Sequence, residues 1–373
     1  MFPARAMTIL GGDSFRDEYS LSFDGTDENI RIPATTFDVD DNTISFVFWA
    51  KRAATNAVHC VLGNTGEAES KHLRFTSAGN IKLENNTAAE EAVMTLNTDD
   101  TSWHHYVVAV SSGTVTAYQD GIAMSVSGST LTTTAVTFDT IAGQGTSGDS
   151  YNFNGNISEI AAYNITLTSS QAKMVYNDRE PFDHKNWSKT GNLTQWWRMG
   201  DCRLDDGNGL IGDETNAILD GNIQNTAFSA DATIAGFTGE SATGFTAVNT
   251  NAGDGVNDNA YGKALSLTAG HTYKLSWTTT INAGDLSQQL DVAVATAIGG
   301  GSGDTATAGT HTAAGDYVNY FTVSSTATHY VVFRLGGNGT YNFTISNVSL
   351  QKVNGNPGTM INMEATDFTG DTP

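Results

Sequence analysis

Apolar and polar residues alternate with a period of two along much of this chain, and that pattern is typical of half-buried β-strands. Clear examples in the first half are Thr43–Ala50, Trp103–Val110 and Thr114–Tyr118. The Asp-Gly pair at 120–121 follows the last of these, and such a pair between alternating strands predicts a tight hairpin. A short helical turn is predicted over Ser169–Met174. Antiparallel strands joined in this way predict two stacked sheets.

A further strand near the middle of the chain is predicted to close this first sandwich. Strict alternation places Ile157, Ala161 and Tyr163 on one face and Ile160 on the other. Gly155 permits a bend or bulge at the start of the strand, because glycine tolerates backbone conformations that other residues avoid.

A second set of strands is predicted in the second half of the chain. Its members are Ala264–Leu267, Thr272–Trp277, Leu290–Val294, Tyr317–Val323 and Tyr330–Leu335. The closing strand begins near Tyr341, and its period slips by one at Asn347, which predicts a bulge. The stretch Gly299–Gly315 is rich in Gly, Thr and Ala and is predicted to be a mobile loop.

The first set of strands resembles a laminin-G-like, concanavalin A-like jelly roll. The segments that carry the resemblance are Tyr19–Gly25, Ile44–Ala50, Trp103–Val110, Ala117–Gly121 and Gly155–Asn164. Their order and spacing match that family, so the resemblance implies an antiparallel β-sandwich over about half of the chain.

The second set resembles carbohydrate-binding-module-like, galactose-binding-like jelly rolls, through the turn at Thr268–Gly270 and the closing segment Phe333–Leu350. We therefore expect an all-β protein with two antiparallel β-sandwich domains in tandem. The expected parts are an N-terminal arm at 1–18, the laminin-G-like domain at 19–215, the second sandwich at 216–353 and a C-terminal arm at 354–373. The second sandwich is interpreted as an insertion that precedes this C-terminal arm.

The excess of acidic over basic residues argues against a nucleic-acid partner. Only 16% of the residues are charged, yet the net charge is −22. Binding to nucleic-acid phosphates needs clusters of Lys and Arg, which the chain lacks, so no nucleic-acid partner is expected. No apolar run has the length of a membrane span or a secretory signal, and we expect neither membrane insertion nor export by that route. Cys60 and Cys202 have no metal-ligand spacing and are interpreted as two independent thiols, although a bridge stays open as an alternative.

Candidate chemistry is sparse, and no catalytic residue is assigned. Glycosidases with concanavalin-like folds present alternating acids on one strand, and a glycosidase needs two carboxylates that flank the sugar bond. Glu159 instead stands alone on its strand. His104 and His105 are neighbours and point to opposite faces, so they are interpreted as structural, one semi-buried and the other exposed. The chain is therefore expected not to be an enzyme.

Calcium is the one candidate ion, because many jelly rolls of these families hold it through loop carboxylates. The candidate ligands are Asp24, Asp120 and Asp149, with a solvated acidic loop as the competing interpretation. No other cofactor is expected. Glycan binding needs exposed aromatic rings, and the sequence does not assign them. The aromatic candidates are Tyr151, Trp187, Trp196, Tyr261 and Trp277.

Two short segments resemble segments of known proteins, and this resemblance indicates a class of function. Gln195–Asp201 contains adjacent tryptophans, interpreted as a last strand with one buried Trp rather than as a ligand platform. It resembles a stretch in laminin-G-like proteins encoded by bacteriophages, and so does the later segment Gly358–Met363. The resemblance implies a non-enzymatic bacteriophage virion structural protein, assembled in the host cytoplasm as a capsid decoration, fibre or tail component. Its partners would be other virion subunits, further copies of itself in a homo-oligomer, and host-surface glycans. The alternative is a soluble bacterial glycan-binding protein.

Overall fold

The structure is a computed structural model of the 373-residue chain. It describes residues 17–37, 43–65, 71–85, 91–128, 130–131, 136–143, 151–202, 205, 210–216, 219–230, 234, 236–249, 258–262, 264–284, 290–298, 304–323, 325–335 and 341–373. Most of the predicted N-terminal arm at 1–18 therefore lies outside the described residues.

The chain divides into two compact units. The first consists of Met1–Gly207, Ile211–Thr215 and Met360–Pro373, and the second of Asn208–Leu210 and Asn216–Thr359. The first unit is thus discontinuous in sequence, and the chain returns to it after the second unit is complete.

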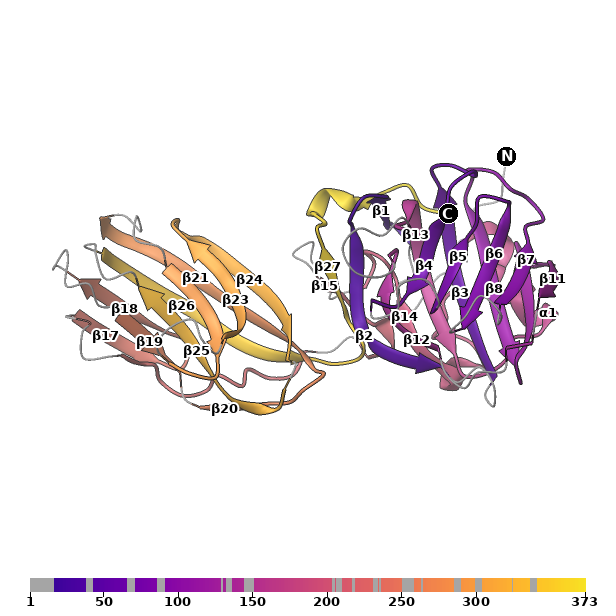
Figure 1. Cartoon of the computed structure of the whole chain (residues 1–373). Helices are drawn as coiled ribbons and strands as arrows, with labels where there is room; N and C mark the ends of the chain where they lie inside the picture. The colour runs from indigo at the N-terminus through magenta and orange to yellow at the C-terminus, as the bar shows by residue number, and fades with distance from the viewer. Residues whose placement is uncertain are drawn as a thin grey trace, which may run out of the picture. The chain divides into compact units, whose positions relative to one another are not determined.

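Two antiparallel sheets form the sandwich of the first unit. One sheet runs in the order β10 (Ile122–Ala123), β9 (Thr114–Gln119), β8 (His104–Ser111), β3 (Thr43–Arg52), β13 (Asn154–Tyr163), β1 (Ser20–Asp24) and β28 (Phe368–Thr369), with β14 (Leu193–Trp197) also beside β13. The other runs in the order β11 (Ser125–Gly128), β7 (Glu91–Thr95), β6 (Asn80–Asn85), β5 (Lys71–Phe75), β4 (His59–Gly63), β12 (Val136–Ile141), β2 (Asn29–Phe37), β27 (Gly358–Ile361) and β15 (Leu210–Ile211). In Figure 1 the yellow tail strand β27 lies beside β15 and the indigo β2.

Alternation along each strand supplies two apolar layers. Phe46 and Phe48 of β3 point into the core between the two sheets, while Val47 points to the opposite face. That opposite face is covered by helix α1 (Ser169–Tyr176), which contributes Ala172 and Val175 to a second apolar cluster. The predicted helical turn is therefore a full short helix. It begins with a capping box between its N-cap residue Thr168 and Gln171.

Strand β13 departs from strict alternation. Ile157 and Ile160 both reach the inter-sheet core, whereas Ala161 packs in the outer cluster, so the predicted grouping of Ile157 with Ala161 is wrong. The reason is a bulge at Glu159, whose φ is +53°, between the two stretches of β13 that pair with β3. The extra residue reverses the facing of every side chain after it.

The Asp-Gly hairpin is confirmed. Gln119 pairs with Ile122, and the two residues between them have φ values of +52° and +72°, at Asp120 and Gly121. Two consecutive positive φ values define the tight turn whose twist matches that of the flanking strands.

The tryptophan pair and the tail are both built into the first unit. Trp196 and Trp197 are buried on opposite sides of their sheet, so the interpretation as a structural strand is confirmed, with both rings buried instead of one. Met360 is buried in the inter-sheet core, and Phe368 packs against it. The described residues expected to form a C-terminal arm thus supply strands to both sheets.

The second unit is also a β-sandwich. One sheet has the order β16 (Ser229–Ala230), β19 (Asp258–Tyr261), β25 (Ala327–Leu335), β22 (Leu290–Ala295) and β23 (Asp304–His311), with β20 (Leu265–Leu267) also beside β25. The other has the order β17 (Gly236–Ser241), β18 (Gly244–Asn249), β26 (Tyr341–Val353), β21 (Thr272–Gly284) and β24 (Gly315–Thr322).

Two predictions for the second unit had opposite outcomes. The bulge at Asn347 is confirmed: its φ is +54°, and Ile345 and Val348 on either side of it both lie in the core. The mobile loop predicted over Gly299–Gly315 is wrong, because β23 occupies Asp304–His311 and pairs with β22. The all-β class with two β-sandwiches is confirmed.

Cys60 and Cys202 are free and buried, which confirms the interpretation as independent thiols. None of the described helices has the length and apolar character needed to cross a bilayer.

Candidate functional site

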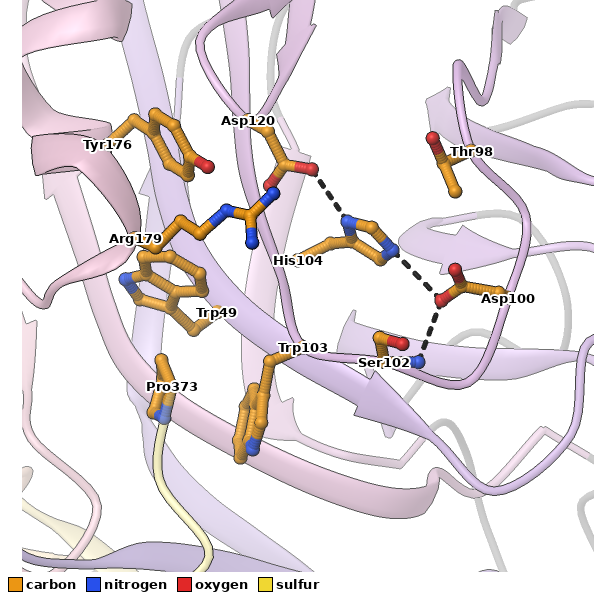
Figure 2. A pocket seen from close by; sticks show the side chains of 10 residues that line it. All are labelled: Trp49, Thr98, Asp100, Ser102, Trp103, His104, Asp120, Tyr176, Arg179 and Pro373. Carbon is orange, nitrogen blue, oxygen red and sulfur yellow. Dashed lines mark hydrogen bonds and ion pairs between the residues drawn. The ribbon is translucent and has the colours of Figure 1, made fainter.

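A pocket of about 490 Å³ opens on the first unit, and aromatic and polar side chains line it together (Figure 2). Its lining consists of Trp49, Thr98, Asp100, Ser102, Trp103, His104, Asp120, Tyr176, Arg179 and Pro373. These residues come from β3, the segment that leads into β8, the β9–β10 turn, the end of α1 and the C-terminal tail. Segments distant in sequence therefore meet around this pocket.

Three aromatic rings supply the apolar surface. Trp49 is only 3% exposed, and its ring packs edge-on against His105 with 5.0 Å between centroids. The ring of Tyr176 lies 5.9 Å from that of Trp49 and is partly exposed, as is Trp103. The ring of Trp49 is thus buried at the base of the pocket lining, while Tyr176 and Trp103 are accessible from solvent.

The tail holds Trp103 in place. The indole Nε1–H of Trp103 donates to Asp371 Oδ1 at 3.0 Å, and Lys51 Nζ donates to the other carboxylate oxygen at 2.6 Å. Burial alone would raise the pKa of Asp371, but the bonds from Lys51 and Trp103 outweigh it, and the pKa is lowered. Asp371 follows β28, which pairs with β1, so the tail and the indole are fixed together.

His104 bridges two carboxylates. Its Nδ1 lies 2.6 Å from Asp120 Oδ2 and its Nε2 lies 3.0 Å from Asp100 Oδ1 (Figure 2). Burial disfavours the imidazolium, yet the bonds and charges of Asp120 and then Asp100 prevail, and the pKa of His104 is raised. Protonated, the ring donates from both nitrogens, and this arrangement satisfies both carboxylates.

Backbone donors fix the two carboxylates further. The Ser102 N–H donates to Asp100 Oδ1 at 2.7 Å, and the His105 N–H donates to Asp120 Oδ1 at 2.9 Å. The pKa of Asp100 is lowered, mainly by the Ser102 bond, against the opposing effect of its slight burial. The left-handed turn conformation of Asp120 places its carboxylate within reach of β8.

Arg179 reaches the pocket from a strained segment. Asn177, Asp178 and Arg179 follow α1 with φ values of +52°, +57° and +78°. Asn and Asp tolerate this region, but a long side chain such as Arg rarely adopts it. A residue such as Arg179 in this region costs about 1–3 kcal/mol, and strain of this kind is frequent at ligand-contacting segments.

The candidate calcium ligands are not brought together by the described structure. Asp24 ends β1, and its Oδ1 accepts from the Thr26 N–H. Asp120 lies in the β9–β10 turn, with one oxygen bonded to His104 and the other to a backbone N–H. Asp149 lies outside the described residues. Calcium at these positions stays a prediction.

Acidic groups do gather elsewhere in the described part of the first unit, where Asp17, Glu159 and Asp201 have ligand oxygens within 4.8 Å of one another. Burial raises the pKa of Asp17 to about 7 and that of Glu159 well above its ordinary value. Glu159 bonds Arg198 Nε at 3.2 Å and accepts from Trp196 Nε1 at 2.5 Å. Because Arg198 already pairs with Glu159, we assign no metal to these three acidic residues.

None of the five aromatic candidates from the sequence lines the pocket. Trp196 and Trp277 are buried in apolar cores, and Trp187 packs beside the outer cluster. Tyr151 lies under the Arg74 guanidinium at 4.6 Å, and Tyr261 is the last residue of β19, where it pairs with β16 and β25. The expectation that one of the two adjacent histidines is exposed is also wrong, since His104 and His105 are both buried.

No local signal marks Trp49, Trp103 or Tyr176 as site residues, because each occurs in an ordinary strand or helix pattern. The Asp-Gly turn and the His-His pair are both visible in the sequence as local features. They meet because β8 pairs with β9, whereas the predicted hairpin joins β9 to β10.

Comparisons with known proteins identify the first sandwich. Residues 24–173 match the family model described as the concanavalin A-like lectin/glucanases superfamily. This region is therefore a concanavalin A-like lectin/laminin G domain, as the sequence resemblance implied, and a further β-sandwich follows it. A search of curated proteins gave no match.

Several solved structures are similar to parts of the chain at low identity. A Bacteroides ovatus protein named as a candidate carbohydrate-binding protein has 16% identity, a TM-score of 0.41, and alignment over 54% of this chain and 56% of its own. A pentraxin from Limulus polyphemus has 12% identity, a TM-score of 0.34, and coverage of 43% and 82%. The sialyllactose-bound CBM40 of a Ruminococcus gnavus sialidase has 17% identity, a TM-score of 0.31, and coverage of 40% and 96%. None of these matches concerns a bacteriophage particle, so the virion interpretation stays a prediction.

Proposed function

We propose that this chain is a non-enzymatic glycan-binding protein that holds a sugar in the pocket of its first unit. The observation that carries the proposal is the convergence of partly exposed Trp103 and Tyr176 with fixed hydrogen-bonding groups in one cavity. A sugar ring presents apolar C–H faces and a polar rim. A site with aromatic walls and a few positioned polar groups matches both.

The size and rigidity of the pocket support this assignment. Its volume of about 490 Å³ lies within the range of small-molecule sites. Asp100 and Asp120 are held by His104 and by backbone N–H groups, so acceptor positions exist before a ligand arrives. Such preorganisation reduces the entropy lost on binding. The match of residues 24–173 to a lectin-containing superfamily is consistent with this role.

Features of the two pocket carboxylates support a binding role rather than hydrolysis. A glycosidase needs a carboxylic acid whose pKa is raised, so that it can protonate the leaving oxygen. The pKa of Asp100 is lowered instead. Both oxygens of Asp120 are engaged, one by His104 and one by the His105 N–H.

The test is binding of the purified full chain to an immobilised glycan panel, followed by calorimetric titration of the best ligand. Trp103→Ala and Tyr176→Ala should each weaken binding tenfold or more, because each removes about 1.4 kcal/mol or more of aromatic contact. Tyr19→Ala is the matched control, since Tyr19 is 43% exposed and does not line the pocket.

Absence of binding across the panel, or wild-type affinity in both pocket variants, would refute the proposal. A reducing-sugar time course with each bound glycan tests the non-enzymatic part. Steady sugar release that disappears in Asp120→Asn would overturn that part.

A further inference from the structure

Asp371 ties the C-terminal tail to the wall of the pocket without lining the pocket itself. Its Oδ1 accepts from Trp103 Nε1–H at 3.0 Å, and its Oδ2 accepts from Lys51 Nζ at 2.6 Å. Its backbone oxygen accepts from Ser20 Oγ at 2.7 Å. One tail residue therefore contacts β1, β3 and the segment before β8 at once, and Pro373, two residues later, lines the pocket together with Trp103 (Figure 2).

The Trp103 ring depends on this contact for its orientation. The ring is partly exposed, and its bond to Asp371 is the one hydrogen bond of its side chain in the described part of the chain. Without that bond, a partly exposed side chain occupies several rotamers, and a ligand has to restrict them again when it binds. The tail carboxylate thus orients the ring before a ligand arrives.

The Asp371 carboxylate adds little to the stability of the fold by comparison. The side chains of Lys51 and Asp371 are 35% and 42% exposed, and ion pairs with that exposure contribute little to stability. The tail has other anchors, because Met360 is buried in the inter-sheet core, Phe368 packs against that core, and β28 pairs with β1. Loss of the carboxylate should therefore leave the tail paired and the sandwich folded.

Resting on the glycan-binding function proposed above, we propose that Asp371 is a positioning residue of the sugar site, which holds the Trp103 ring in the orientation that the face of the sugar requires. The converse follows, because coupling between two binding equilibria is reciprocal. A sugar that binds the oriented ring favours the state in which Asp371 is engaged. Sugar binding and the docking of this part of the tail are therefore coupled.

The experiment is a double-mutant cycle between Asp371 and Trp103, measured by calorimetric titration of the full chain with the best ligand of the glycan panel. Asp371→Ala should weaken binding about three- to tenfold, which corresponds to the cost of immobilising one large side chain. Trp103→Phe keeps an aromatic ring but has no N–H to donate. In the Trp103→Phe background, Asp371→Ala should change the affinity by less than about twofold. A merely structural role of Asp371 would weaken binding equally in both backgrounds.

Two single substitutions accompany the cycle. Asp371→Asn keeps an oxygen that accepts from the indole but cannot pair with Lys51, so it should retain more of the affinity than Asp371→Ala does. Asp367→Ala is the matched control, because Asp367 is a carboxylate of the same tail whose Oδ2 accepts from the Glu364 N–H at 2.6 Å. Its affinity should stay within about twofold of wild type. The melting temperature of Asp371→Ala should lie within about 4 °C of wild type.

Hydrogen exchange reports the same contact without and with a sugar. In the ligand-free protein, Asp371→Ala should speed exchange of Trp103 Nε1–H about tenfold or more, because the group loses a charged acceptor. In wild type, a saturating sugar should slow that exchange further and should also slow exchange of the tail amides at 368–371. In Asp371→Ala the same sugar should no longer slow the exchange of these tail amides.

The outcomes distinguish this inference from the proposed function. An equal loss of affinity in both backgrounds, or unchanged exchange of Trp103 Nε1–H in Asp371→Ala, would overturn the positioning role and leave glycan binding intact. Failure of wild type to bind any glycan of the panel would overturn the glycan-binding function itself. Exchange of Trp103 Nε1–H would still decide, in that event, whether Asp371 fixes the ring.

Discussion

Replacement of Asp120 by Asn should reverse the sign of one contribution to the pH dependence of stability. Asn keeps the shape of the side chain and tolerates the left-handed turn before Gly121. It removes the charge that lies 2.6 Å from His104 Nδ1. The neutral amide can still accept from the His105 N–H, so the hairpin should form normally.

The size of the effect follows from the contacts of His104. A hydrogen bond to a charged partner contributes about 1.5–3 kcal/mol, which corresponds to a ten- to hundredfold change in proton affinity. Burial then becomes the dominant influence on His104, because it already opposes the two carboxylates in the wild type. The pKa of His104 should fall from above its ordinary value to below it.

The sign of the linkage changes with that fall. In the wild type the folded-state pKa of His104 is raised, so its contribution is fully present below the unfolded value of about 6.5. That contribution is lost as the pH rises through the folded-state pKa. In Asp120→Asn the folded-state pKa lies lower than 6.5, so stability from this group is lost as the pH falls below about 6.5.

The assay is an NMR titration of the His104 ring together with urea unfolding at pH 5.5 and pH 8. The difference in unfolding free energy between variant and wild type should grow toward the acidic side. An unchanged pKa of His104 in Asp120→Asn would refute the argument. So would a stability difference that does not depend on pH, because both follow from the same pair of contacts.

Two other substitutions test the fold around the site. His105→Phe should raise the unfolding free energy at pH 7.5 by about 1–3 kcal/mol, because both ring nitrogens of His105 are buried without partners. The advantage should grow by about 2 kcal/mol at pH 5, because burial lowers the pKa of His105 to about 3 and only the unfolded state gains a proton below about pH 6.5. Urea unfolding at both pH values measures this difference. An equal advantage at both pH values would contradict the prediction. Gly155→Ala should lower the unfolding free energy by about 3 kcal/mol or more, because the φ of Gly155 is +133° and an added Cβ would lie 2.1 Å from the Lys51 carbonyl oxygen. Urea unfolding measures this loss, and a loss below about 1 kcal/mol would contradict the close approach of β3 and β13.

The strands that the sequence predicts well are those whose inner and outer faces differ in polarity. Strand β26 is an example, since the slip at Asn347 is visible as an interrupted apolar pattern. Strand β4 is buried at all five positions and shows no alternation. Strand β23 carries few apolar residues and is fixed by backbone pairing to β22, so composition alone suggested a loop.

The candidate site escapes sequence reasoning for a different reason. Trp49 belongs to an ordinary alternating strand, and Tyr176 is the last residue of a short helix. Only the pairing of β8 with β3 and β9, and the covering of the sheet by α1, brings these rings to the same place. Nothing local in the sequence marks Arg179 as a pocket residue, because its position at the pocket depends on three consecutive residues in the left-handed conformation.

Completion of the pocket depends on a contact between two segments of the first unit that are far apart in the sequence. Trp103 is bonded to Asp371, which is 268 residues later in the chain. The main segment of the second unit, Asn216–Thr359, lies in the sequence between the main body of the first unit and this tail. Contacts of such high sequence separation form slowly, because loop closure must precede them. The inter-sheet core of the first unit is supplied mostly by residues before the second unit, whereas the fixed orientation of Trp103 requires the tail to return. The geometry of the pocket therefore depends on the tail more strongly than the fold of the first unit does, and a variant that weakens tail docking should lose the proposed sugar binding before it loses the fold.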